Sequence, residues 1–132
     1  MDSFELTCVF PVSASYLYNA WLDSETHSLF TGGMAAIEPR IDSYFTAWNG
    51  YITGKIVELD PPKRILMHWR TTDFPAEAEN SLLELTLEEI SSGCQLTLRH
   101  TEIPKGQGSQ YLKGWDLHYF IPMKVYFSTL LN

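Results

Sequence analysis

The sequence predicts an α+β fold in which a curved, seven-stranded antiparallel sheet grips one long C-terminal helix. Two observations predict it: residues 35–101 read almost entirely as strands, and after Gly108 apolar residues recur at steps of three and four. Strands with one solvated face must cover the other, and the long helix is the only predicted element large enough to do so. We therefore expect residues 1–132 to form a single domain with a pocket between sheet and helix.

The predicted elements follow one another without a linker, an internal repeat or a low-complexity tract. Ser13 is placed to cap a first short helix, and Asp23 or Ser24 to cap a second one that stops at Gly32 and Gly33. The predicted bounds are a strand at residues 4–10, helices at 13–22 and 24–30, strands at 35–38, 43–48, 51–59, 64–70, 81–90 and 95–101, and a helix after Gly108.

Turn signals separate several of these strands. Pro61 and Pro62 lack an N–H and have a fixed φ, so the chain must reverse or bulge between the runs on either side of them. Asn49-Gly50 is a strong hairpin signal, and the Ser-Ser-Gly sequence at residues 91–93 is another. Each of these signals indicates antiparallel neighbours.

The alternation within the strands assigns their faces. Met67 and Trp69 share a parity on an apolar face, whereas His68 falls on a mixed face that is at least partly wet. Leu98 and His100 share the parity that we expect to point toward the concave side of the sheet. These residues are the first candidates for the wall of a cavity.

The long helix contributes further candidates. Tyr111, Trp115 and Tyr119 recur at four-residue steps and form one stripe. We interpret Trp115 chiefly as core packing, whereas the hydroxyls of Tyr111 and Tyr119 need partners when buried and suit the orientation of a ligand. Pro122 lies within the helix, where its missing N–H and its ring should kink or weaken the preceding turn.

Charge and composition exclude several classes of function. Sixteen acidic residues against nine basic ones give a net charge of -7, and the basic residues are scattered, so nucleic acid is not an expected partner. No segment has a signal-peptide pattern or the roughly twenty apolar residues that span a bilayer. We expect a soluble, cytoplasmic protein without membrane insertion. The aromatic content of 14% suits a core or a pocket.

The cysteines and the metal-ligand spacing indicate neither a metal nor another cofactor. Cys8 and Cys94 each lie in a strand-like run and are interpreted as small buried side chains. A disulfide between them is the alternative if their strands are neighbours. Asp116 near His118 is the only carboxylate–histidine pair at helical spacing, which is too few ligands for zinc.

Four histidines and one tryptophan complete the set of polar aromatic candidates. We expect His27 to be exposed on the second short helix and His68 to point away from the core, whereas His100 and His118 share the cavity. Each is interpreted as a hydrogen-bonded histidine, and no residue is assigned as catalytic. Trp48, next to the Asn-Gly turn, is expected at the surface or in an interface.

Three runs of sequence carry a resemblance to a known family. They are GKIVELDPPKRILMHW at residues 54–69, LTLRHTEIP at 96–104 and GWDLHYFIPMKVYF at 114–127. With the element order, they resemble the START-like SRPBCC superfamily, and more closely the homologues of the C-terminal domain of the activator of the 90-kDa heat-shock protein ATPase. The resemblance covers residues 10–127 and implies a helix-grip (START/Bet v-like) fold with a hydrophobic cavity.

The superfamily does not imply one chemistry, since members include carriers, sensors, cyclases and chaperone regulators. The first hypothesis is a binding protein for a small apolar molecule; a co-chaperone-like regulator of the 90-kDa heat-shock protein ATPase is the second, and a cyclase or hydrolase with His100 or His118 as base is the third. The sequence is compatible with a homodimer. The candidate cavity residues are Met67, Trp69, Leu98, His100, Tyr111, Trp115, His118 and Tyr119.

Overall fold

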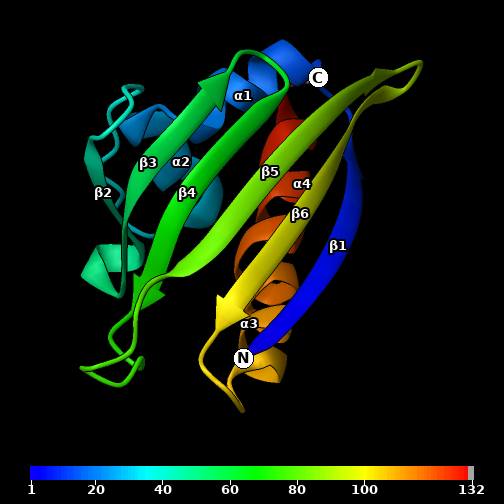
Figure 1. The fold of residues 1–132 in the computed structure, drawn as a ribbon. Coiled ribbons are helices and arrows are strands. Elements are labelled where there is room, and N and C mark those ends of the chain that lie inside the picture. The colour runs from blue at the N-terminus through cyan, green and yellow to red at the C-terminus, as the bar shows by residue number, and fades with distance from the viewer. Residues whose placement is uncertain (131–132) are drawn as a thin grey trace.

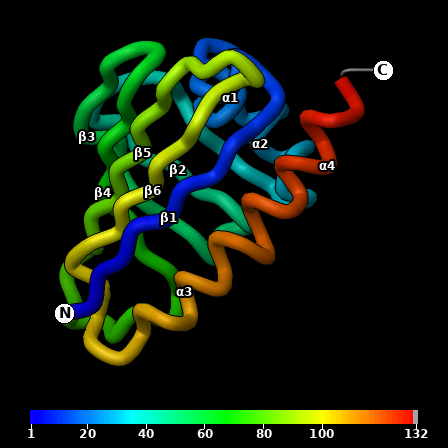
Figure 2. Tube along the Cα trace, turned by 90° about the vertical axis from the view of Figure 1, so that its right-hand side faces the viewer, coloured from blue at the N-terminus to red at the C-terminus, as the bar shows by residue number. Residues whose placement is uncertain are grey.

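The computed structural model describes residues 1–130 and confirms the helix-grip α+β fold. Six antiparallel strands form one twisted sheet in the order β1-β6-β5-β4-β3-β2, and all the helices lie on the same face of it (Figures 1 and 2). The elements are β1 (Asp2–Phe10), α1 (Ala14–Trp21), α2 (Ser24–Thr31), β2 (Tyr44–Ala47), a 3₁₀ turn (Trp48–Gly50), β3 (Ile52–Asp60), β4 (Arg64–Thr71), β5 (Ser81–Ile90), β6 (Gly93–Ile103), α3 (Gly108–Trp115), a π-helical turn (Asp116–Phe120) and α4 (Ile121–Thr129).

The sheet has six strands and not seven, because residues 35–38 do not complete a ladder. Within this segment Ala36 makes a single antiparallel bridge with Thr46 of β2. The N–H of Ile37 donates instead to the Ser24 hydroxyl on α2 at 2.8 Å, and the same hydroxyl donates to the Ile37 carbonyl at 3.0 Å. The segment therefore ties α2 to the sheet edge, although its burial alternates as in a strand.

The first two helices begin as predicted. The Ser13 hydroxyl accepts a hydrogen bond from the Tyr16 N–H, and the Asp23 carboxylate accepts one from the Thr26 N–H. Helix α2 ends at Gly32, whose φ of 86° lies in the left-handed region that glycine adopts without steric cost.

The two prolines connect β3 and β4 through a cis Pro61–Pro62 peptide bond, and the face assignment of β4 is confirmed. Met67 and Trp69 are buried, whereas His68 is exposed. Trp69 lies opposite Gly54 of β3, where a Cβ would come within 2.1 Å of a neighbouring backbone oxygen. Glycine at this position thus lets the strands approach closely.

The C-terminal helix runs across the sheet in three pieces (Figure 2). In the π-helical turn the Ile121 N–H donates to the Asp116 carbonyl, five residues back. Pro122 follows at once, in the first turn of α4, where a missing N–H is tolerated. The π turn lies directly before this proline, at the place where the sequence predicted a kinked or weakened turn.

Both cysteines are free and buried. Their strands, β1 and β6, are neighbours, but Cys8 lies opposite Leu96 and Cys94 lies opposite Phe10, so the two thiols are diagonal to one another. None of the helices within residues 1–130 has both the length and the apolar character to cross a membrane.

Candidate ligand cavity

A cavity of about 220 Å³ lies between the C-terminal helix and the ends of β3 and β4. It is smaller than the pockets that hold drug-sized molecules. Most of its wall is aromatic. The lining residues are Trp48, Tyr51, Ile52, Trp69, Tyr111, Gly114, Trp115, His118 and Tyr119.

The structure brings five of the eight candidate residues together on this wall: Trp69, Tyr111, Trp115, His118 and Tyr119. The other three lie elsewhere. Met67 lines a separate space of about 10 Å³, which is barely the size of one water molecule. Leu98 is fully buried in the core, and His100 lies behind the cavity wall, so the prediction that His100 and His118 share the cavity is wrong.

The sequence reasoning missed four lining residues: Trp48, which was expected at the surface or in an interface, and Tyr51, Ile52 and Gly114. Trp48 is half-buried and lines the cavity, and its ring packs edge-to-face on His118 with the centroids 5.5 Å apart. Its φ of 49° breaks the strand parity from which its direction was predicted. The Asn-Gly turn signal was therefore correct for the reversal and misleading for the side chain.

His100 joins two tryptophans of the cavity wall through a chain of hydrogen bonds. The Trp115 indole N–H donates to His100 Nδ1 at 3.1 Å, so the proton of the neutral ring is on Nε2 and is donated to Ser81 Oγ at 2.8 Å. The Ser81 hydroxyl then donates to the Trp69 carbonyl at 2.9 Å. Burial lowers the pKa of His100 to about 3, which keeps the ring neutral.

His27 is fully buried, which corrects the prediction that it is exposed. Its Nδ1 donates to the Trp21 carbonyl at 2.8 Å, so its Nε2 accepts from the Tyr119 hydroxyl at 2.8 Å. Burial lowers the pKa of His27 to about 4 and raises the pKa of Tyr119. The pair is therefore neutral, and Tyr119 is fixed from behind.

A third polar group surrounds Tyr51 and Tyr111 at the edge of the cavity. The Tyr111 hydroxyl donates to Gln107 Oε1 at 2.9 Å and shares a 2.6 Å hydrogen bond with the Thr71 hydroxyl. The Tyr51 hydroxyl donates to the Asp73 carboxylate at 2.6 Å. These contacts join α3 to β4, and the start of β3 to the loop after β4.

The arrangement suits binding better than acid–base chemistry. Both ring nitrogens of His100 and of His27 are engaged within the protein, and both pKa values are far below neutrality. His118 lies on the cavity wall in an exposed position on the π-helical turn. Within residues 1–130 no three His, Cys, Asp or Glu side chains form a group that could hold a metal ion.

A comparison with known proteins shows to which family the chain belongs. Residues 11–128 match the family model described as activator of Hsp90 ATPase homolog 1-like protein. The chain belongs to this family. The match includes every residue of the cavity wall and confirms the predicted resemblance to the START-like superfamily.

Members of the Hsp90 ATPase activator family include longer proteins. Over 115 residues the chain is 29% identical to the activator of 90 kDa heat shock protein ATPase homolog 1 from Mus musculus, a match that covers 87% of this chain and 34% of the relative. The chain therefore spans about a third of the length of that relative.

Two solved structures share the fold. The crystal structure of an HSP90 activator from Plasmodium falciparum has a TM-score of 0.78 and 25% identity, and the match covers 90% of each chain. The solution structure of the Aha1 dimer from Colwellia psychrerythraea has a TM-score of 0.77, with 96% of each chain covered. At 13% identity, the second comparison shows the fold alone.

Proposed function

We propose that the protein binds a small, largely apolar molecule in the cavity between the sheet and the C-terminal helix. The observation that carries the proposal is a cavity of about 220 Å³ whose wall is formed mainly by tryptophan and tyrosine rings. Such rings offer a large apolar contact area with little conformational freedom to lose on binding.

The polar contacts behind the wall support binding, because they fix the rings before a ligand arrives. Trp115 is fixed by His100, and Tyr119 is fixed by His27. Both rings are about 97% buried. A preformed wall of this kind lowers the cost of ordering side chains in the complex.

Gly114 offers a direct test, because a Cβ at this position meets no atom within 4 Å and the residue lines the cavity. Gly114→Leu adds volume at the wall and replaces a glycine within a helix, so the variant should fold at least as well as the wild type. Ser109→Leu, on an exposed position of α3, is the matched control.

Protein isolated from its native host is extracted with solvent, and the extract is examined by mass spectrometry. We expect one small molecule to accompany the wild type and Ser109→Leu, and to be lost or strongly depleted in Gly114→Leu. Equal amounts in all three proteins, or none in the wild type, would contradict the proposal.

Regulation of a 90-kDa heat-shock protein ATPase is the second candidate function, favoured by the family match over residues 11–128. We propose that the contact uses the exposed surface and not the cavity. Titration of the host's 90-kDa chaperone with this protein should raise its ATP turnover, and Gly114→Leu should retain the effect. Absence of binding at micromolar concentration would remove this candidate.

A further inference from the structure

Four aromatic residues of the cavity wall donate their polar hydrogen to an acceptor within the protein, either behind the wall or at the edge of the cavity. The acceptors differ in kind: a carboxylate, an amide oxygen and two imidazole nitrogens. The pairs are Tyr51 with Asp73, Tyr111 with Gln107, Trp115 with His100 and Tyr119 with His27. The hydrogen-bond donors of these four rings are therefore already used, and a ligand with an acidic group cannot obtain them without breaking the contacts that fix the wall.

Three further residues of the wall, Trp48, Trp69 and His118, carry ring N–H groups. That of Trp48 has no acceptor within residues 1–130, but protein atoms cover it. Trp69 and His118 make no side-chain hydrogen bond within the same part of the chain, and His118 lies at an exposed position. The wall therefore offers few free donors beside many aromatic rings, and the face of an aromatic ring carries negative π-electron density.

The one charged group hydrogen-bonded to the wall, within residues 1–130, is negative. The Asp73 carboxylate accepts from the Tyr51 hydroxyl at 2.6 Å and from the Gln110 amide at 3.0 Å. A phenol that donates to a carboxylate gains electron density in its ring, which strengthens its attraction for a cation. The net charge of -7 acts in the same direction over longer distances.

We propose that the cavity takes the alkylammonium group of an organic cation, held by the faces of its tryptophan and tyrosine rings. Aromatic walls bind quaternary ammonium groups because the ring faces are negative, and desolvation within a cavity strengthens the attraction. Within residues 1–130, an anion would find free ring N–H groups on Trp69 and His118 but none on the four committed rings, and no positive group is hydrogen-bonded to the wall. This inference rests on the proposed function, since it names the class of molecule that the same cavity accepts.

Choline and its neutral isostere dimethylbutanol, in which a carbon atom replaces the nitrogen, separate charge from shape. Calorimetric titration of the full chain with each should give at least about tenfold tighter binding of choline. Equal or tighter binding of dimethylbutanol would overturn the inference and leave the proposed binding function intact. Binding of neither compound at millimolar concentration would overturn the inference, and retention of a molecule extracted from the native host would still support the function.

Two matched variants test the contribution of the carboxylate. Asp73→Asn keeps the shape and removes the charge, and it should weaken choline binding several-fold while leaving dimethylbutanol binding unchanged. Asp42→Asn removes the same charge from an exposed side chain away from the cavity, at a φ of 70° that asparagine tolerates, and should leave both affinities unchanged. An equal loss of choline binding in both variants would show that only the net charge matters, and would overturn the role given to Asp73.

Discussion

His100 and His27 show how single buried residues set the cavity wall. Each is neutral, and each accepts a hydrogen bond from an aromatic residue of the wall through one nitrogen and donates through the other. A phenylalanine in either position would fill similar space but would leave a buried tyrosine or tryptophan donor without a partner. The histidines therefore act on the cavity by orienting its rings.

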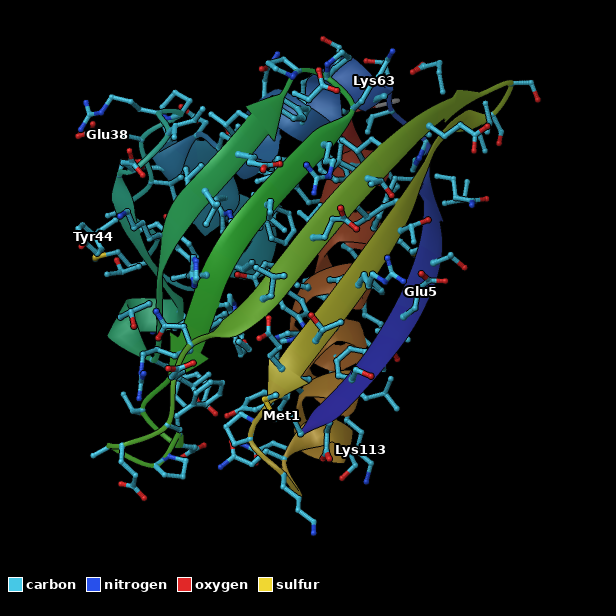
Figure 3. All side chains as sticks on the ribbon, in the orientation of Figure 1. Met1, Glu5, Glu38, Tyr44, Lys63 and Lys113 are labelled. Carbon is cyan, nitrogen blue, oxygen red and sulfur yellow. The ribbon has the colours of Figure 1, made fainter. Side chains whose placement is uncertain are left out.

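The His27–Tyr119 pair gives a prediction at this scale. Tyr119→Phe removes the hydroxyl and leaves the buried His27 Nε2 without a donor, so the free energy of unfolding should fall by about 1–3 kcal/mol in urea titration. Tyr44→Phe is the same substitution at a ring that is 78% exposed on the outer edge of β2 (Figure 3), and it should change stability by less than about 0.5 kcal/mol. Equal losses in the two variants would contradict the structural role of the pair.

At the scale of elements, the C-terminal helix has an unusual spacing of buried residues. Five of them follow at steps of four: Tyr111, Trp115, Tyr119, Met123 and Phe127. In a regular α-helix each such step advances about 40° beyond a full turn, so four steps would carry the last residue far around the helix from the first. The π-helical turn in the middle unwinds the helix and keeps these residues on the sheet side.

The spacing predicts that packing, and not Pro122, maintains the π turn. In Pro122→Ala the Ile121 N–H should still donate to the Asp116 carbonyl, and the free energy of unfolding should change by less than about 1 kcal/mol, because the proline lies in the first turn of α4. A crystal structure of the variant, with urea unfolding, checks both. A regular α-helix through residues 116–120 would show instead that the proline creates the turn.

At the scale of the whole molecule, the sequence patterns predicted the architecture better than the cavity. Period-two alternation and turn residues located six strands, since both follow from local chemistry. Residues 35–38 alternate as well, but which partner takes their N–H groups depends on Ser24, which is distant in sequence.

The errors at the site have the same origin. The positive φ of Trp48 and the burial of His27 against Tyr119, 92 residues away, are consequences of tertiary packing that no local pattern carries. The stripe of aromatic residues at four-residue steps along the helix was visible in the sequence. Its members Tyr111, Trp115 and Tyr119 lie on the cavity wall.

The two buried histidines make global stability depend on pH. The unfolded state takes up protons as the pH falls below 6.5, whereas the folded histidines resist protonation until about pH 4 for His27 and about pH 3 for His100. Protonation therefore favours the unfolded state in this window, and stability falls as the pH falls. Between pH 7.5 and about 5.5, which stays above the sequence pI of about 4.9, the loss should be about 1.4 kcal/mol for each histidine.

Urea unfolding at the two pH values measures this loss in the free energy of unfolding. In His27→Gln the loss over the same interval should be half that of the wild type, whatever the stability of the variant at pH 7.5. A wild type equally stable at both values would mean that the two histidines are not buried as neutral rings.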